Sequence, residues 1–302
     1  MLNGFVDIIC VDDIVFRIPI EYYFSLANSP YYAHRYFRAV DVYPPRGENI
    51  VLSPFSGELI YYRVVGGEHV LGFQVGEHYV RVLHVKPLLD VGDEVRVGGV
   101  LGELATSPFF HYWTDKHMHL EVRRRPEFLR ASGGVKLSLC KSLLDLIGSA
   151  LESNTNEFSG EVSGEIVFFE NNRYVLVKPK YNIRGYTTPL QACFNDKCGF
   201  IDGGIPHYGH GILVTTSDSR GGISEVIVKD TVLGVVDDYY GYGFYHFSIT
   251  GKSLRIFVGD IRVKGVGLYI GDPYLKIIPL DWASFPYREG DVVEIKFTSK
   301  GV

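Results

Sequence analysis

The sequence has no long apolar run and no basic stripe. No stretch of about 18 apolar residues occurs, so we expect no membrane span. The 30 Lys and Arg residues are outnumbered by 35 Asp and Glu, and the net charge is -5. The densest basic cluster, Arg123 to Arg125, is short, and we interpret it as a solvated strand end. We therefore expect neither a membrane nor a nucleic acid as a partner.

Sulfur and amide side chains are also scarce. The four cysteines (Cys10, Cys140, Cys193 and Cys198) fit no firm metal or disulfide spacing. We expect free thiols, with a bridge between Cys193 and Cys198 as the alternative. Two Met and two Gln against 21 Tyr indicate a thermophilic source. Residues 1–20 carry several charges and lack the unbroken apolar core of a secretory signal, so we expect a cytoplasmic location.

What the sequence does contain is typical of a mainly β protein. Short runs rich in Val, Ile, Tyr and Phe, such as residues 57–65 and 79–85, are separated by Gly, Pro and Asp turns. One helix is predicted over residues 135–152, where apolar residues recur with a period of 3.6. A polar break follows it. These patterns predict a β-domain at residues 1–132, a helix and linker at 133–157, and a second β-rich domain at 158–302.

The segment His117-Met118-His119-Leu120-Glu121 predicts a strand that carries two histidines. Residues i and i+2 of a strand point to the same face, so both imidazoles would face one place. Such a pair suits a zinc or proton-transfer site. The alternative is a pair of surface histidines on a half-exposed strand.

Three further segments precede this strand in a definite order. The first contains Asp41 and ends in Pro44-Pro45-Arg46-Gly47. The second, at 51–59, reads VLSPFSGEL, and the third contains His84 and continues into VGDEVRVGGVLG at 91–102. The four segments together resemble the LytM/M23 family of zinc metallopeptidases over about residues 34–125. That family shows an HxxxD motif, an apolar V.AP..G.V segment, a His-bearing strand and an HLHFEVR-like strand.

The resemblance implies a duplicated-hybrid β-fold related to barrel-sandwich domains. It also implies that Asp41 and His119 are zinc ligands, and that His84 and His117 handle the attacking water and the developing oxyanion. Zinc needs about three N or O ligands and an open position for water. Neutral imidazoles can then accept and return a proton near neutral pH.

One position departs from the family pattern. The first zinc histidine is expected four residues before Asp41, and Phe37 stands there. His34 lies seven residues before Asp41, and an inserted turn would bring it into place as the third ligand. Otherwise only two ligands remain, and the domain would be a catalytically inactive binding or structural module.

Other candidates are weaker. His111 is either a loop residue or a substitute ligand, and the neighbouring Tyr112 and Trp113 are candidate groove aromatics. Asp202, His207 and His210 lie in a Gly-rich segment of the second half. Gly and Pro residues serve turns, so we interpret this segment as a loop, with a metal site as the alternative. The aromatic stretch at 237–246 is interpreted as core strand and turn, or as a binding face.

The sequence thus favours a zinc-dependent, peptidase-like hydrolase whose partner is a peptide or protein. The alternative is an inactive module on the same fold. A third hypothesis is a phosphohistidine carrier that uses His84, because such carriers share the hybrid-barrel class. The His-x-His-x-Glu strand favours the metallopeptidase.

Overall fold

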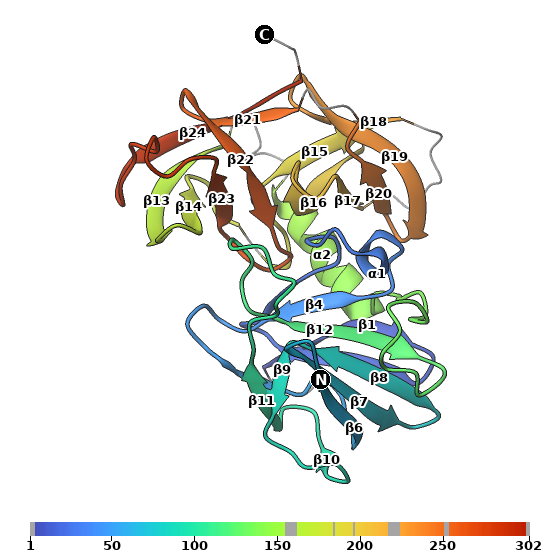
Figure 1. The fold of residues 1–302 in the computed structure, drawn as a ribbon. Coiled ribbons are helices and arrows are strands. Elements are labelled where there is room, and N and C mark those ends of the chain that lie inside the picture. The colour runs from blue at the N-terminus through green and yellow to red at the C-terminus, as the bar shows by residue number, and fades with distance from the viewer. Residues whose placement is uncertain are drawn as a thin grey trace. The chain divides into compact units, whose positions relative to one another are not determined.

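The protein is mainly β, as predicted, in a computed structural model that describes residues 4–154, 162–183, 185–195, 197–216, 224–250 and 254–299 (Figure 1). The chain folds into two compact units. Unit 1 comprises Met1–Leu26 and Tyr31–Asp145, and unit 2 comprises Ala27–Pro30 and Leu146–Val302. The end of the predicted linker, residues 155–157, lies outside the described residues.

Unit 1 contains the first twelve strands. They are β1 (Phe5–Val11), β2 (Ile14–Pro19), β3 (Tyr23–Ser25), β4 (Val40–Tyr43), β5 (Ile50–Leu52), β6 (Gly57–Val65), β7 (Glu68–Val75), β8 (His78–Leu83), β9 (Val85–Pro87), β10 (Glu94–Val95), β11 (Val100–Leu104) and β12 (Met118–Arg123). A one-turn helix, α1 (Tyr32–Arg35), lies between β3 and β4, and α2 (Lys141–Asn154) runs across the boundary into unit 2. The sequence did not predict α1.

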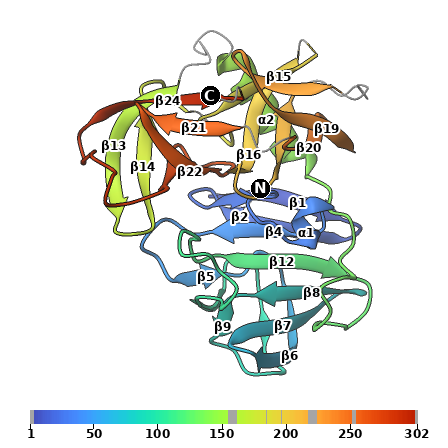
Figure 2. The same ribbon diagram turned by 45° about the horizontal axis from the view of Figure 1, so that its top comes forward.

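The main sheet of unit 1 has the strand order β10-β6-β7-β8-β12-β4-β3 (Figures 1 and 2). β12 lies inside this sheet, and all six of its residues are buried. Its side chains alternate, so Met118, Leu120 and Val122 share one face, while His119, Glu121 and Arg123 share the other. The second face is therefore a buried polar row, which is stable only if its members have hydrogen-bonding partners.

The long helix starts later than predicted, at Lys141 rather than at residue 135. The preceding backbone is hydrogen-bonded to other segments of unit 1. The amide of Val135 donates to the carbonyl of Val122 at 2.9 Å, and the amide of Leu137 donates to that of Phe37 at 2.8 Å. These contacts replace the helical hydrogen bonds that the apolar period favoured, so tertiary pairing overrides local propensity.

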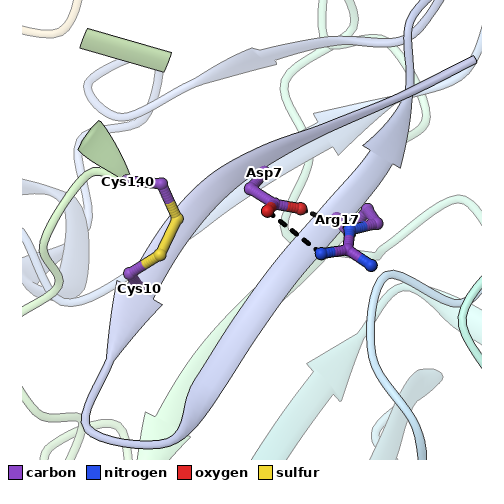
Figure 3. Close-up of a disulfide and its surroundings, with 4 residues drawn as sticks. All are labelled: Asp7, Cys10, Arg17 and Cys140. Carbon is purple, nitrogen blue, oxygen red and sulfur yellow. Dashed lines mark hydrogen bonds and ion pairs between the residues drawn. A yellow bond between two sulfur atoms is a disulfide. The ribbon is translucent and has the colours of Figure 1, made fainter. Parts of the chain in front are cut away.

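The expectation of free thiols is wrong. Cys10 of β1 is bonded to Cys140, the residue before α2, and Figure 3 shows this disulfide beside the Asp7–Arg17 ion pair of the β1–β2 hairpin. Cys193 and Cys198, on the adjacent strands β15 and β16 of unit 2, form the second disulfide, which was the alternative for that pair. The first disulfide was invisible to the sequence because its cysteines lie 130 residues apart.

Unit 2 contains the remaining strands. They are β13 (Val162–Glu170), β14 (Tyr174–Pro179), β15 (Gln191–Phe194), β16 (Lys197–Ile205), β17 (His210–Thr215), β18 (Glu225–Val228), β19 (Thr231–Gly241), β20 (Phe244–Ser248), β21 (Arg255–Val258), β22 (Ile261–Leu268), β23 (Leu275–Pro279) and β24 (Val292–Thr298). All twelve belong to one sheet.

Pairing closes this sheet into two circuits of strands. The first circuit runs β15-β18-β19-β20-β17-β16 and closes where β15 pairs with β16. The second runs β22-β21-β24-β13-β14-β23 and closes where β22 pairs with β23. The first circuit is contiguous in sequence and interrupts the second between β14 and β21. Closure leaves few unpaired strand edges, which protects a β-rich chain against aggregation.

Neither helix of the described residues is long and apolar enough to cross a membrane.

Candidate metal centre

Strand register places two of the predicted ligands opposite each other. β4 and β12 are antiparallel, and Asp41 is the cross-strand partner of His119. On its other side, His119 pairs with Leu83, the last residue of β8. His84 follows immediately after β8, so register brings Asp41, His84 and His119 together although they are far apart in sequence.

His34 reaches the same place through a tight turn. The amide of Phe37 donates to the carbonyl of His34, and that of Arg38 donates to the carbonyl of Ala33 at 2.7 Å. Phe37 itself has φ of 53°, which is left-handed backbone that a bulky residue rarely adopts. This turn takes up the three residues by which the His34–Asp41 spacing exceeds the family pattern.

The structure brings together a possible ligand set of His34, Asp41 and His119. Their ligand atoms all lie within 4.8 Å of one another, and all three residues are buried. The Nε2 atom of His34 lies 3.2 Å from the Oδ1 atom of Asp41 and 3.2 Å from the Nδ1 atom of His119. The Nδ1 atom of His119 lies 2.8 Å from the same Asp41 oxygen.

Each imidazole has an outer partner, defined as the group that hydrogen-bonds the ring nitrogen facing away from the cluster. This partner determines whether the other ring nitrogen faces the cluster as an acceptor. The carbonyl of Leu26 lies 3.0 Å from Nδ1 of His34, and a carbonyl only accepts, so Nδ1 carries the proton. The carboxylate of Glu121 lies 3.1 Å from Nε2 of His119, so Nε2 donates to it. In the neutral imidazoles, Nε2 of His34 and Nδ1 of His119 then face Asp41 with lone pairs. Three lone pairs that converge in a buried site repel one another unless a cation or a proton lies among them.

The pKa values of the buried groups indicate that a proton would relieve this repulsion in the absence of a metal. Burial lowers the pKa of His119, but hydrogen bonds to Asp41 and Glu121 outweigh burial and raise that pKa to about 9. Burial raises the pKa of Asp41, but His117, His34 and His119 outweigh it and hold the pKa well below its usual value. Without a metal, the proton therefore resides on His119 near neutral pH.

Glu121 extends the hydrogen-bond network away from the candidate ligands. Burial raises its pKa, but His119, Arg81 and Arg123 outweigh burial and lower that pKa to about 2. Arg123, which is almost completely buried, donates to Glu121 through Nη2 at 2.6 Å and to the carbonyls of Glu127, Arg130 and Ser132. The buried polar face of β12 is thus satisfied, and Glu121 is an outer partner of His119 that the sequence interpretation did not name.

The second pair of histidines lies beside the candidate ligands. Nε2 of His117 lies 3.5 Å from Oδ2 of Asp41, and its Nδ1 donates to the carbonyl of Asp115 at 2.8 Å. The rings of His84 and His117 are 4.9 Å apart between centroids. Burial lowers the pKa of both histidines, that of His117 to about 4. Both are therefore neutral near pH 7 and able to accept a proton.

Glu68 and Ser107 orient His84. One oxygen of Glu68 accepts from both the backbone amide of His84, at 3.1 Å, and its ring Nδ1, at 2.9 Å. The hydroxyl of Ser107 donates to the other oxygen. His84 has φ of 67°, so these bonds hold a strained residue in place. No motif in the sequence pointed to Glu68, which begins β7.

The weaker candidates lie elsewhere. His111 is exposed on its loop and stacks on Trp113 at 4.5 Å between ring centroids, outside the ligand set. Among the described residues of unit 2, Asp202, His207 and His210 do not form a ligand set. Asp202 accepts from the amide of Ala27, and His207 packs on Tyr208.

A family model described as "Domain of unknown function (DUF8155) N-terminal domain" matches residues 17–139. Apart from Ala27–Pro30, the matched residues belong to unit 1, and they include all three residues of the candidate centre. No curated protein matches the chain.

Several solved structures are similar to the chain at low identity. The peptidase lysostaphin from Staphylococcus simulans is 14% identical, with a TM-score of 0.30 and coverage of 90% of this chain and 95% of lysostaphin. A chain of the SpoIIQ–SpoIIIAH pore-forming complex is 13% identical (TM-score 0.26; 40% of this chain, 66% of that chain), and Helicobacter pylori Csd3 is 16% identical (TM-score 0.26; 50% and 48%). This chain therefore spans less than two thirds of the latter two. At TM-scores of 0.30 and below, this likeness carries no argument.

Proposed function

We propose that unit 1 is a zinc-dependent hydrolase of the LytM/M23 type that cleaves a peptide or protein. The observation that carries the proposal is the convergence of Nε2 of His34, Oδ1 of Asp41 and Nδ1 of His119. Two imidazole nitrogens and one carboxylate oxygen match a catalytic zinc site with an open fourth position. The inactive-module alternative rested on a shortage of ligands at Phe37, and His34 offers the missing donor.

The outer partners support a metal rather than a chance cluster. Both ligand histidines donate their far N–H, His34 to the carbonyl of Leu26 and His119 to the carboxylate of Glu121. Such partners are typical of metal-binding histidines because they fix the ring and its tautomer. A bound Zn²⁺ would lower the pKa of a water molecule and polarise a carbonyl group.

His117 and His84 supply the proton transfers. The Nδ1 atom of each ring donates to a fixed acceptor, so Nε2 is the nitrogen that exchanges a proton. Because both are neutral near pH 7, either ring is able to accept a proton from the attacking water. The resulting imidazolium would donate to the developing oxyanion or to the leaving amine.

We also propose a cytoplasmic location in a thermophilic cell. Disulfides are rare in most cytosols, but intracellular proteins of hyperthermophiles are an exception. The two disulfides and the scarcity of Met and Gln agree with such a source. Unfolding of the oxidised protein above about 65 °C, the upper end for mesophile domains, is the expected result.

The test is the metal content of the purified protein, measured by elemental mass spectrometry. We expect about one zinc per chain in the wild type and almost none in His34→Ala and His119→Ala. His111→Ala is the matched control, because His111 is an exposed histidine of the same unit outside the ligand set. Its zinc content should equal that of the wild type.

Activity is tested next, with casein as a general protein substrate. We expect chelator-sensitive cleavage that His117→Ala reduces by about 10²–10⁴-fold while zinc content is retained. Absence of zinc in the wild type, even after incubation with the metal, would refute the proposal. Zinc without cleavage would favour the inactive module.

A further inference from the structure

Four residues of unit 2 lie within the sequence of unit 1, just before the candidate ligand His34. The chain leaves unit 1 after Leu26, passes through Ala27–Pro30 in unit 2 and re-enters unit 1 at Tyr31. His34 follows three residues later on α1. Peptide bonds therefore connect this short segment directly to the helix that carries a proposed zinc ligand.

Unit 2 holds the segment by two buried hydrogen bonds. The amide of Ala27 donates to Oδ2 of Asp202 at 3.1 Å, and Asp202 is completely buried. The carbonyl of Ser29 lies 2.7 Å from Nε2 of His210, which is also completely buried. Since a carbonyl only accepts, His210 donates this bond. Burying a carboxylate and an imidazole is costly, and the hydrogen bonds that these two side chains form with the segment offset part of that cost.

The backbone of unit 2 also approaches the segment closely. A Cβ atom at Gly203 would lie 3.4 Å from both Cβ and the carbonyl oxygen of Ala27. At 3.4 Å this is an ordinary van der Waals contact, but Gly203 has φ of 135°, which L side chains rarely adopt, so its backbone conformation favours glycine. His210 is braced in turn by His246, whose Nε2 lies 3.1 Å from Nδ1 of His210.

The two residues that flank the segment both hold His34. Leu26 accepts the ring N–H of His34 through its carbonyl at 3.0 Å. Tyr31 accepts the backbone N–H of His34 through its carbonyl at 3.1 Å. A shift of Ala27–Pro30 would therefore move both the ring orientation and the backbone of the ligand.

We infer that Asp202 and His210 are positioning residues for His34, acting through the segment Ala27–Pro30. This assigns a role to the first strand circuit of unit 2, which carries both residues on β16 and β17. The inference rests on the proposed function for its metal. The part of the inference that concerns the position of His34 requires no metal and rests on the hydrogen bonds alone.

The experiment uses the full chain and measures the Zn²⁺ dissociation constant by competition with a chromophoric chelator. His210→Ala removes the donor to Ser29, and we expect affinity to fall by about 10–100-fold, as for the loss of an outer partner. His210→Gln places an amide N–H at a similar reach and should restore most of the affinity. Thr188→Val is the control, because it removes a buried hydrogen bond of unit 2, to the carbonyl of Ile201, without touching the segment.

A second measurement needs no metal. Amide hydrogen exchange over residues 26–36 should be faster in metal-free His210→Ala, and in Asp202→Ala, than in the wild type or Thr188→Val. Unchanged affinity and exchange in folded His210→Ala would overturn the inference, as would an equal loss in Thr188→Val. If the wild type binds no zinc, the proposed function fails, and exchange alone decides whether Asp202 and His210 hold His34.

Discussion

Both units bury histidines beside a carboxylate, but the hydrogen bonds run differently. In unit 1 the near nitrogens of His34 and His119 converge with Asp41 on one point. In unit 2 the contacts form a chain from Asp237 through His246 and His210 to the carbonyl of Ser29. Each of the four imidazole nitrogens in that chain has its own neighbour, so these nitrogens do not converge on one point. The presence of histidines and a carboxylate does not by itself make a metal site. A metal site also requires that the lone pairs of these groups point to one place.

The two disulfides offer the largest difference between the units. In the chain-entropy model, the Cys10–Cys140 bond stabilises by about 5 kcal/mol because it closes a long loop. The Cys193–Cys198 bond closes a short hairpin and contributes about 2 kcal/mol in the same model. We therefore expect Cys10→Ser/Cys140→Ser to destabilise unit 1 more than Cys193→Ser/Cys198→Ser destabilises unit 2.

Urea unfolding followed by tryptophan fluorescence separates the two effects. The chain has two Trp, Trp113 in unit 1 and Trp282 in unit 2. Trp282→Phe therefore leaves a reporter in unit 1 alone, and Trp113→Phe leaves a reporter in unit 2 alone. Equal losses in the two double variants would contradict the loop-length argument.

An intermediate effect is expected at the outer partner of His119. Glu121→Gln keeps an acceptor near Nε2 of His119 but removes the charge, so zinc affinity should fall by about 10–100-fold. Glu127→Gln is the control, since the side chain of Glu127 forms an exposed ion pair with Arg130 and is not a hydrogen-bonding partner of His119. Chelator competition measures both. An unchanged affinity in Glu121→Gln would show that convergence of the three ligands suffices without the charged partner.

The smallest effect, counted per pH unit, is a pH dependence of zinc affinity, which distinguishes the converging site of unit 1 from the hydrogen-bond chain of unit 2. Hydrogen bonds to Asp41 and Glu121 outweigh burial and raise the pKa of His119 to about 9, so below that pH the metal must displace a proton. Zinc affinity should rise about tenfold per pH unit from 7 toward 9 and level off above it. Calorimetry in buffers of different ionisation enthalpy should detect about one proton released per zinc at pH 7.5. Release of no proton would mean that His119 is not a ligand.

The sequence predicted the mainly β fold because alternation and turn residues are local signals. It also predicted the strand that carries His119, since a period of two needs no tertiary information. It placed the start of α2 six residues too early, because apolar periodicity cannot reveal that Val135 and Leu137 pair with other segments. It missed α1 entirely, since one helical turn is too short to leave a periodic signal.

The residues of the candidate site also fall into those that the sequence indicated and those that only the structure revealed. Asp41, His84, His117 and His119 were named from motif order, and the structure gathers them through the register of β4, β12 and β8. Whether His34 joins them was open in the sequence, because the path of a loop depends on backbone turns such as the one at Phe37. Glu68 carried no signal, since its contact with His84 crosses from the start of β7 to the end of β8.

By itself, the sequence determined the residue types, the strand pattern and the order of the His- and Asp-bearing segments. These follow from local propensity and from side chains that repeat at fixed spacing. Only the tertiary structure decided that His34 reaches Asp41, that Cys10 meets Cys140, and that Ala27–Pro30 is held by Asp202 and His210. Contacts between distant residues depend on strand register and chain path, which no local pattern encodes.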